Sequence, residues 1–280
     1  MKKIITEKVL TKYEEYLYEE EKTRATIKKY ICDLKKLVEY ADGKEITKKM
    51  MVAYKEHLLE EGNYKLTSIN SFLVAANRLF EFMEWYGLRV KTYRIQKEAF
   101  VPESRDLSKK EYKKLVGIAE RKGKKRLAMM IQTICATGIR ISELQHITVE
   151  SLDKGVAEIY CKGKQRKVLL PKRLLKLLRQ YIVELGIQKG MIFCTKYGNA
   201  VDRSNIWKEM KALGEEADVS EEKIYPHNLR HLFAKAFYEM DKDMAKLADM
   251  LGHSSIETTR IYIMTTCEEH QRQLDRMGLV

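Results

Sequence analysis

The sequence predicts a mainly α-helical protein of two domains, the second of which carries a small antiparallel β-sheet. Apolar residues recur at helical spacing over much of the 280-residue chain, which contains only 3 prolines. A polar segment at 97–106 interrupts this pattern, and the stretch 155–171 alternates in side-chain character as strands do. We therefore expect a helical domain at 1–96, a linker at 97–106 and a mixed domain at 107–280.

The first domain is expected to be a bundle of about four helices. The clearest helix has apolar residues at i, i+3, i+4 and i+7, namely Ile69, Phe72, Leu73, Ala76, Phe80 and Met83. Thr67 or Ser68 is its candidate N-cap, and Gly87 stands where a C-cap glycine would. The other helices are expected near 6–20, 26–40 (ending at Asp42-Gly43) and 48–61 (ending at Gly62).

The second domain is expected to begin at 107, after the linker that contains Pro102, with Ser108 and Glu111 forming a capping box. Residues 155–171 predict a hairpin that turns at Gly163, and 191–202 a further extended stretch. The remaining segments are expected to be helical: 109–121, 125–136, 140–147, 172–185, 204–217, 227–240, 242–250 and 255–263.

The chain is strongly basic, with 53 Lys and Arg against 40 Asp and Glu and a net charge of +13. Such a field attracts polyanions, although an ordinary basic protein would fit the charge as well. The 5 cysteines include no Cys-x-x-Cys pair, so neither a disulfide framework nor a zinc site is expected. No secretory signal and no apolar run of about 18 residues is found, which favours a cytoplasmic protein.

The first candidate site residues lie in the string Ala136-Thr137-Gly138-Ile139-Arg140-Ile141-Ser142-Glu143-Leu144. Arg140 and Glu143 are three residues apart, so they share one face of the expected helix. A carboxylate beside an arginine fixes the guanidinium fork, which can then bind a phosphate through two N–H groups. The alternative is a surface ion pair of little energetic weight.

A second group begins at Pro226, which is placed to start a helix. His227 and Arg230 again lie three residues apart and share a helix face. Phosphate binding beside them is favoured by the free N–H groups of a helix start. His231 is expected to point elsewhere, and we predict a packing role for it.

The third group is Leu251-Gly252-His253, followed by Tyr262. Ser254 and Glu257 have capping-box spacing, so Tyr262 is expected well into the helix that starts there or at its end. Because the chain has 16 tyrosines, only the order of the three groups singles out Tyr262. Two arginines, histidines and a tyrosine, without paired acidic residues for a metal, suit attack of a tyrosine hydroxyl on a phosphodiester.

In this order, the strings at 137–144, 227–231 and 251–253 and the final tyrosine resemble the motifs of the tyrosine recombinase (phage integrase) family. Within that family, the chain is most similar to the short Xer-like members. The resemblance covers 107–280 well and 1–100 only as a general helical layout. It implies an N-terminal SAM-like domain that binds core DNA, a C-terminal catalytic domain, and a two-domain C-shaped clamp around DNA.

The resemblance also implies what the site residues do. Tyr262 would attack the scissile phosphorus, leaving a 3′-phosphotyrosyl bond and a free 5′-hydroxyl. Arg140 and Arg230 would hold the non-bridging oxygens, and His253 would donate a hydrogen bond to one of them. His227 would accept the proton of the tyrosine, whose ordinary pKa near 10 makes help necessary.

The sixth residue of the family is a lysine in a hairpin turn that protonates the leaving 5′-oxygen. The string Cys161-Lys162-Gly163-Lys164 resembles this turn and points to Lys162, with Lys164 as the alternative. Glu143 is expected to support Arg140. Neither a cofactor nor a metal is expected.

Family members usually act as tetramers on two duplexes. The resemblance therefore implies double-stranded DNA with a two-arm core site, a homotetramer on synapsed DNA, and a location on the nucleoid. A short helix with Gln273, Leu274 and Met277 would dock on a neighbouring subunit, or the tail is a frayed terminus.

Other functions and roles stay open at this point. A type IB topoisomerase would use the same chemistry, and an accessory DNA-binding protein would leave it idle. Among recombinases, chromosome-dimer resolution, integration or excision of a mobile element, and DNA inversion all remain open.

Overall fold

The computed structural model describes residues 2–96, 106–161, 164–195, 197–264 and 267–278. The chain divides into two compact units, Met1–Lys97 and Glu98–Val280, each with a hydrophobic core of its own. The predicted linker lies outside the described residues except for Asp106. The fold class is confirmed, because the described chain is mainly helical with one two-stranded antiparallel sheet.

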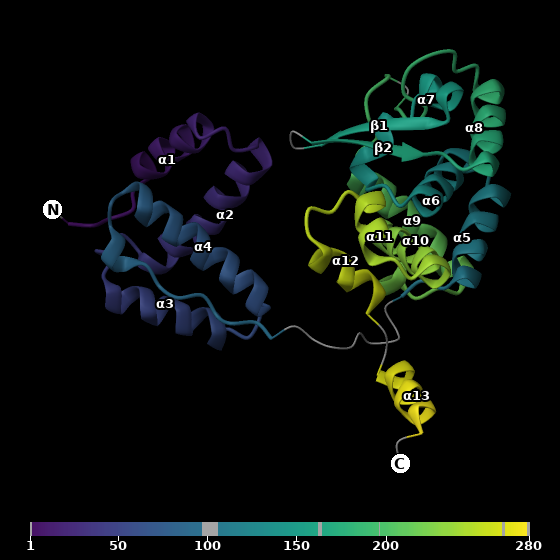
Figure 1. The fold of residues 1–280 in the computed structure, drawn as a ribbon. Helices are drawn as coiled ribbons and strands as arrows, with labels where there is room; N and C mark the ends of the chain where they lie inside the picture. Colours follow the sequence, from purple (N-terminus) through teal and green to yellow (C-terminus); the bar gives the residue numbers. More distant parts are fainter. Residues whose placement is uncertain (1, 97–105, 162–163, 196, 265–266, 279–280) are drawn as a thin grey trace. The chain divides into compact units, whose positions relative to one another are not determined.

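Helices build the N-terminal unit (Figure 1). They are α1 (Glu7–Glu19), α2 (Arg24–Ala41), α3 (Lys48–Glu60), α4 (Leu66–Phe82) and the short 3-10 helix η1 (Tyr86–Leu88). Helix α4 packs against both α2 and α3, while α1 packs against α2. The apolar stripe of α4 predicted its position in the core, since Ile69, Leu73 and Phe80 are fully buried.

The predicted caps of α4 are wrong at both ends. The helix starts after Lys65, so Thr67 and Ser68 lie inside its first turn rather than at the N-cap. Its C-cap is Met83, and Gly87 lies in η1. The left-handed residue that turns the chain is Glu84, with φ of 56°, after which the Trp85 N–H reaches back to Phe80. At the N-terminal end of α4, the N-cap Lys65 makes no side-chain capping hydrogen bond.

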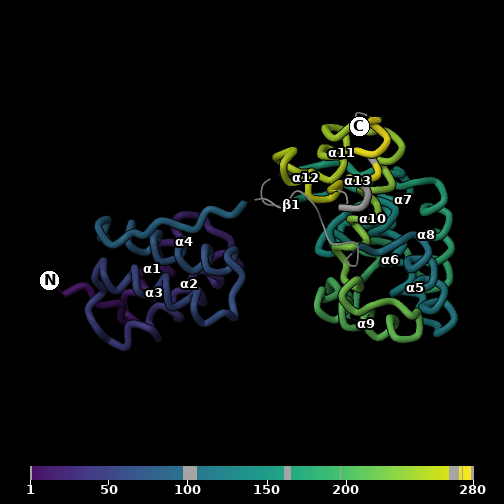
Figure 2. The backbone as a smooth tube through the Cα atoms, turned by 90° about the horizontal axis from the view of Figure 1, so that it is seen from below, coloured from purple at the N-terminus to yellow at the C-terminus, as the bar shows by residue number. Residues whose placement is uncertain are grey.

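Helix α6 lies in the middle of the C-terminal unit and packs against α5, α8, α9 and α10. Figure 2 shows α9 at one end of this unit and α11 and α12 at the other. The α-helices of the unit are α5 (Lys109–Arg121), α6 (Lys125–Thr137), α7 (Val149–Lys154), α8 (Lys172–Leu185), α9 (Arg203–Ala217), α10 (Pro226–Asp241), α11 (Met244–Leu251), α12 (Ile256–Ile263) and α13 (Cys267–Met277). The short 3-10 helices are η3 (Ile141–His146) and η4 (Glu221–Lys223).

The predicted hairpin is formed by β1 (Val156–Cys161) and β2 (Lys164–Leu169), with Val156 opposite Leu169 and Cys161 opposite Lys164. Its turn at 162–163 lies outside the described residues. Ala157, Ile159 and Val168 face the core, as the alternation predicted. In the stretch 191–202, pairing is limited among described residues to isolated bridges, Thr148 with Met191 and Cys194 with Ala200.

Several local predictions can be compared with the structure. The capping box of Ser108 and Glu111 is present in both directions. The segment 140–147 is not an α-helix but the 3-10 helix η3, because Ile147 is already extended and Thr148 bridges Met191. Helix α7, which Thr148 caps, was not predicted from the sequence. The N-cap of α12 is Ser255, not Ser254, and its hydroxyl accepts the Glu257 N–H.

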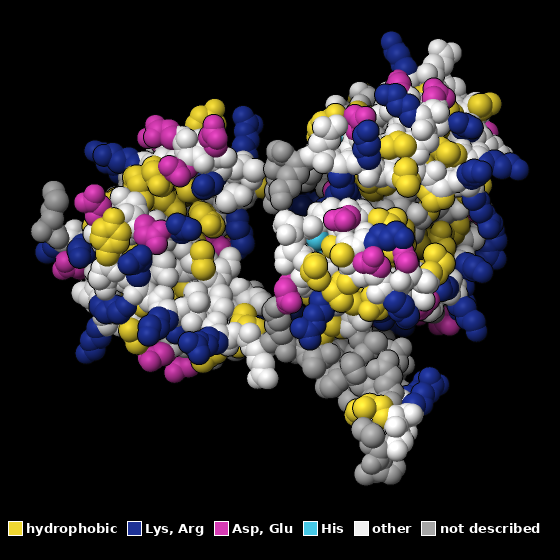
Figure 3. Space-filling model, viewed as in Figure 1, with side chains coloured by type: hydrophobic (Ala, Val, Ile, Leu, Met, Phe, Trp, Pro, Cys, Tyr) yellow, Lys and Arg dark blue, Asp and Glu magenta, His cyan; other side chains and the backbone are white. Residues whose placement is uncertain are grey.

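Lys and Arg side chains are spread over the visible face of each unit in Figure 3. This distribution fits the net charge of +13. Within the described ranges, we find no helix that combines the length and apolar character required to cross a membrane.

Candidate active site

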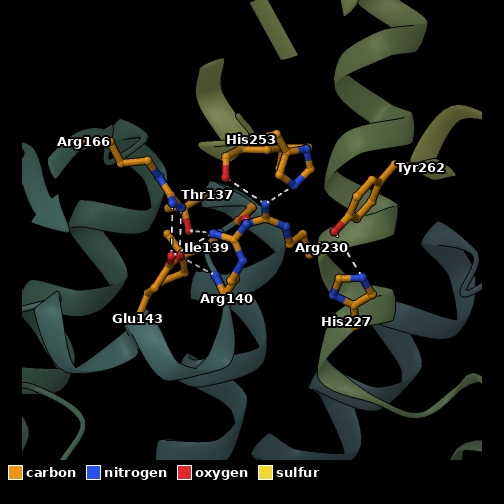
Figure 4. A network of polar contacts seen from close by, with 11 residues as sticks. Thr137, Ile139, Arg140, Glu143, Arg166, His227, Arg230, His253 and Tyr262 are labelled. Carbon is orange, nitrogen blue, oxygen red and sulfur yellow. Dashed lines mark hydrogen bonds and ion pairs between the residues drawn. The ribbon is translucent and has the colours of Figure 1, made fainter. Parts of the chain in front are cut away.

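The candidate site lies where the C-terminal end of α6 meets η3, the start of α10, the end of α11, and α12. Figure 4 shows Arg140, Arg230, His253, His227 and Tyr262 converging on this place from these different segments. Five of the predicted site residues are therefore brought together, although up to 122 positions separate them in sequence (140 to 262).

Gly138 sets the local backbone at the end of α6. It is the left-handed C-cap, with φ of 66°. A Cβ there would lie 2.4 Å from Cδ1 of Phe233 and 3.0 Å from a methyl group of Leu251. Only glycine therefore lets α10 and α11 approach the turn this closely, which places the Gly138 carbonyl beside Arg230.

Arg140 and Glu143 form the ion pair that their spacing predicted. Nη1 of Arg140 lies 3.1 Å from Oε1 of Glu143, and the Arg140 backbone N–H donates to Oε2 at 2.7 Å. Glu143 is only 2% exposed, whereas the Arg140 side chain is 36% exposed. The alternative of a surface ion pair is therefore wrong for Glu143, because its carboxylate is buried, whereas the Arg140 side chain is partly exposed to solvent.

A third charged residue, Arg166 on β2, completes this cluster. Its Nη1 and Nη2 donate to Oε1 and Oε2 of Glu143 at 3.0 and 2.8 Å. Burial disfavours the charged form of Glu143. The Arg140 backbone N–H and the Arg166 guanidinium nevertheless hold the pKa of that carboxyl below its ordinary value. The carboxylate is thus ionised and fixed between two arginines.

Arg230 is the largest fully buried side chain of the described chain, with 1% exposure. Nη1 donates to the Gly138 carbonyl at 2.6 Å, and Nη2 donates to the Leu251 carbonyl at 2.8 Å. Among the described residues, no carboxylate neutralises it by direct contact, and its buried Nε has no partner. Burial and the nearby charge of Arg140 lower the pKa of Arg230 to about 10. Two close guanidinium groups with an unused donor form a natural anion site.

His253 has a defined tautomer. Nη2 of Arg230 lies 2.7 Å from Nε2 of His253, and because arginine only donates, Nε2 must accept. The ring proton therefore sits on Nδ1, which donates to Oγ1 of Thr259 at 2.8 Å. Burial and the charges of Arg230 and Arg140 lower the pKa of His253 to about 4. In this ligand-free state the ring is neutral, and its Nε2 faces Arg230.

Tyr262 lies near the end of α12 and is 4% exposed. Its hydroxyl is 3.1 Å from Nε2 of His227, and its ring lies 5.7 Å from the Arg230 guanidinium. Although part of His227 stays exposed, burial of the rest and the charges of Arg230 and Arg140 lower the pKa of His227. A neutral His227 with its proton on Nδ1 accepts the tyrosine hydroxyl.

His231 was expected to point away from the site, but its side chain points into it. Its ring packs against Tyr262 at a centroid distance of 4.3 Å and against His227 at 5.1 Å. Burial, together with the His227 ring, lowers the pKa of His231 to about 4. The predicted direction of the His231 side chain was wrong because α12 packs against α10 and covers the face that carries His231 as well as the face that carries His227.

Lys162 lies outside the described residues, and the side chain of its alternative, Lys164, is not described either. Two residues that the structure adds to the cluster, Arg166 and Thr259, were not predicted from the sequence. Arg166 lies in the predicted hairpin, four residues beyond Lys162, without any local signal for its contact with Glu143. Thr259 could have been found from its position three residues before Tyr262 on one helix.

Comparison with known proteins identifies the family of the chain. The family model "Phage integrase family" matches residues 105–269, and the model "Phage integrase, N-terminal SAM-like domain" matches residues 10–87. Tyrosine recombinase XerA of Pyrococcus furiosus is 27% identical over 99% of this chain and 96% of its own length.

Solved structures show the same fold. A XerH site-specific recombinase bound to palindromic difH substrate, in a post-cleavage complex, aligns with a TM-score of 0.74 at 22% identity, over 89% of this chain and 79% of that one. A lambda integrase tetramer bound to a Holliday junction aligns with a TM-score of 0.71 at 18% identity, over 91% and 76%.

The first family model spans more than half of the chain, so the chain belongs to the phage integrase family. Its activity is that of a tyrosine site-specific recombinase. The topoisomerase and accessory-protein alternatives are not favoured by these matches.

Proposed function

We propose that the chain cuts and rejoins double-stranded DNA through Tyr262, with Arg140, Arg230, His227, His253 and Lys162 as its chemical groups. The Tyr262 oxygen forms a bond to the scissile phosphorus while the bond from phosphorus to the 5′-oxygen breaks. A 3′-phosphotyrosyl ester and a free 5′-hydroxyl result. A 5′-hydroxyl of another strand then attacks the ester, which turns cleavage into strand exchange.

The observation that carries this proposal is the 3.1 Å contact between the Tyr262 hydroxyl and Nε2 of His227. The lowered pKa of His227 keeps its ring neutral near pH 7, so it is ready to take the tyrosine proton. The Tyr262 ring also lies 5.7 Å from the Arg230 guanidinium, so the attacking oxygen belongs to a side chain that is held next to a positive charge.

The two arginines supply complementary parts of the phosphate site. The Arg140 side chain is 36% exposed and can contact an incoming phosphate from the solvent side, whereas Arg230 is fully buried behind it. The buried Nε of Arg230, which has no hydrogen-bond partner among the described residues, offers a further donor to an entering anion. Preorganised donors of this kind are each worth roughly 10²–10³ in rate.

His253 needs a proton on Nε2 before it can donate to a phosphate oxygen. In the ligand-free site, this nitrogen accepts from Arg230 instead. A bound phosphate brings negative charge between the two arginines, and it therefore raises the pKa of His253 and favours the doubly protonated ring. Lys162 is proposed to protonate the departing 5′-oxygen, with Lys164 as the alternative.

The assembly is proposed to be a homotetramer on two synapsed two-arm core sites. Lambda integrase, which shares the fold, has been solved as a tetramer bound to a Holliday junction, and the strong basic charge of this chain suits such a partner. We propose that residues 1–96 form a core-DNA-binding domain and residues 107–280 the catalytic domain, and that they close around the duplex as a clamp. A cytoplasmic location on the nucleoid follows from this function.

A covalent trap tests the proposal. Wild type, Tyr262→Phe and the control Tyr181→Phe, whose ring packs with Phe193 in the main core of the C-terminal unit, are incubated with fragmented genomic DNA and then denatured. Sequencing of protein-bound DNA should recover one short sequence from wild type and the control, but none from Tyr262→Phe. Scattered recovery would favour relaxation of DNA over recombination. Equal recovery with Tyr262→Phe, or none with wild type, would remove Tyr262 as the nucleophile.

A further inference from the structure

Arg166 connects the hairpin to the candidate active site. Its two terminal nitrogens each donate to one oxygen of Glu143, at 3.0 and 2.8 Å. Both side chains are largely buried, with 16% exposure for Arg166 and 2% for Glu143. This two-pronged geometry fixes the carboxylate and the guanidinium in a common plane.

The same carboxylate also holds Arg140, so its orientation matters for the phosphate site. Each oxygen accepts one bond from Arg166 and one from Arg140, through Nη1 at 3.1 Å and the backbone N–H at 2.7 Å. Four donors on two oxygens leave the carboxylate a single orientation. Arg140 therefore gives Glu143 one side-chain bond, and its other N–H groups stay available for a ligand.

Loss of Arg166 would change this balance. Glu143 would keep its buried negative charge but lose two hydrogen-bond donors. The Arg140 guanidinium, which already contacts Glu143, is the group best placed to replace them. The carboxylate would then turn toward Arg140 and engage both of its prongs. Arg140 would face Glu143 rather than the phosphate, although no residue that touches DNA had been altered.

The position of Arg166 is also defined from its other side. It lies across Gly252, where an added Cβ would stand 2.5 Å from Nη1 and 2.6 Å from Cδ. Gly252 precedes His253, so this one side chain spans the hairpin, Glu143 and the histidine segment. The Leu-Gly-His string thus needs its glycine for two reasons, a left-handed φ of 65° and room for Arg166.

Fold stability alone gives a poor account of this contact. A buried ion pair is a weak stabilising device, since desolvation offsets much of the attraction. Arg166 moreover leaves its buried Nε without a partner among the described residues. An arrangement that costs free energy and orients Arg140 is better explained by its effect on the site.

We propose that Arg166 is a positioning residue, which holds Glu143 so that Arg140 presents its remaining N–H groups to the scissile phosphate. This inference rests on the proposed function. It assigns Arg166 no contact with DNA and no proton transfer.

The test compares Arg166→Ala, Arg166→Lys and the control Lys167→Ala. Lys167 is exposed on the same strand, so its loss removes an equal charge without reaching Glu143. The probe is a nicked duplex that carries the sequence recovered in the covalent trap, and single-turnover formation of the Tyr262 ester is measured. Arg166→Ala should slow this step by roughly 10²-fold, the cost of a misplaced group. DNA affinity should match the control, and Arg166→Lys should fall between wild type and Arg166→Ala.

A second probe separates this role from simple anchoring of the Lys162 turn. In a duplex with a bridging 5′-phosphorothiolate, sulfur leaves without protonation, so loss of the general acid no longer matters. The Arg166→Ala defect should persist on this probe, because Arg140 is still misplaced. Recovery of the wild-type rate would overturn the proposal, as would a defect confined to DNA affinity. Absence of any ester with wild type would instead reject the proposed function.

A third comparison works even if Arg166→Ala folds poorly. Gly252→Ala crowds Arg166, whereas Gly186→Ala introduces the same left-handed strain, at φ of 66°, with nothing within 4 Å. Gly252→Ala should slow ester formation about 10-fold or more relative to Gly186→Ala. In an Arg166→Ala background this difference should disappear, because the clash is gone. Equal effects of the two alanines in the wild-type background would contradict the positioning role.

Discussion

Replacement of Gly138 by alanine should destabilise the C-terminal unit far more than its change of one methyl group suggests. An L-residue in the left-handed region costs about 1 kcal/mol. The new Cβ would also lie 2.4 Å from the Phe233 ring and 3.0 Å from Leu251, so packed side chains must shift. Such overpacking typically costs about 1–3 kcal/mol, which gives a total loss of about 2–4 kcal/mol.

The chain offers a suitable reporter for this measurement. Its 2 tryptophans are Trp85 in the N-terminal unit and Trp207 on α9, so a Trp85→Phe background reports the unfolding of the C-terminal unit alone. Urea unfolding is then followed by Trp207 fluorescence. The control is Gly123→Ala, which has φ of 67° and nothing within 4 Å of the added carbon. It should lose only about 1 kcal/mol.

The difference between the two variants isolates the contact with Phe233. A difference below about 1 kcal/mol would show that the ring moves aside freely, and the argument for a required glycine would then rest on φ alone. Ester formation should also slow in Gly138→Ala, since the displaced carbonyl is an acceptor for Arg230.

Further predictions concern pH, the histidine tautomer and the tail. The pKa of His231 is about 4 in the folded chain against 6.5 in the unfolded one, so the unfolded state binds more protons between these values. The contribution of His231 should lower the free energy of unfolding by at most about 3 kcal/mol as pH drops from 6.5 to 4. Because the pKa of His253 is also about 4, His231→Gln should reduce the slope measured in urea titrations without abolishing it. Thr259→Val removes the acceptor of His253 Nδ1 and should slow ester formation roughly 10-fold with unchanged DNA affinity, whereas an unchanged rate would reject the tautomer argument. Truncation after Cys267 should abolish synapsis in gel-shift assays and spare single-site binding, and recombination by the truncated chain would refute docking of α13.

The sequence predicted best those elements whose two ends are marked by local signals such as proline or glycine. Helix α8 was predicted at 172–185 and spans Lys172–Leu185, because Pro171 precedes it and Gly186 takes the left-handed cap. The hairpin was likewise predicted from alternation, and its inward residues are buried. Failures occurred where tertiary contacts decide, as at η3, whose helical turn is cut short by the bridge between Thr148 and Met191.

In the candidate site, too, the residues within sequence motifs were predicted and the contacts that depend on tertiary packing were not. The order of motifs identified Arg140, Arg230, His227, His253 and Tyr262, and the structure brings these side chains together. Their catalytic roles remain a proposal. Spacing along one helix could not reveal that Arg166 shares Glu143 with Arg140, because that contact depends on how the hairpin packs against η3.

The pairing of Glu143 with two arginines also sets the charge that the DNA meets. Among the described residues of the cluster, Arg140, Arg166 and Arg230 oppose the single carboxylate of Glu143, while His227 and His253 are neutral at pH 7. The remaining charge of about two exceeds the single charge of a phosphodiester. In the proposed reaction, this surplus of charge, present before His253 takes up a second proton, would favour the pentacoordinate species, in which both non-bridging oxygens are negative, over bound substrate.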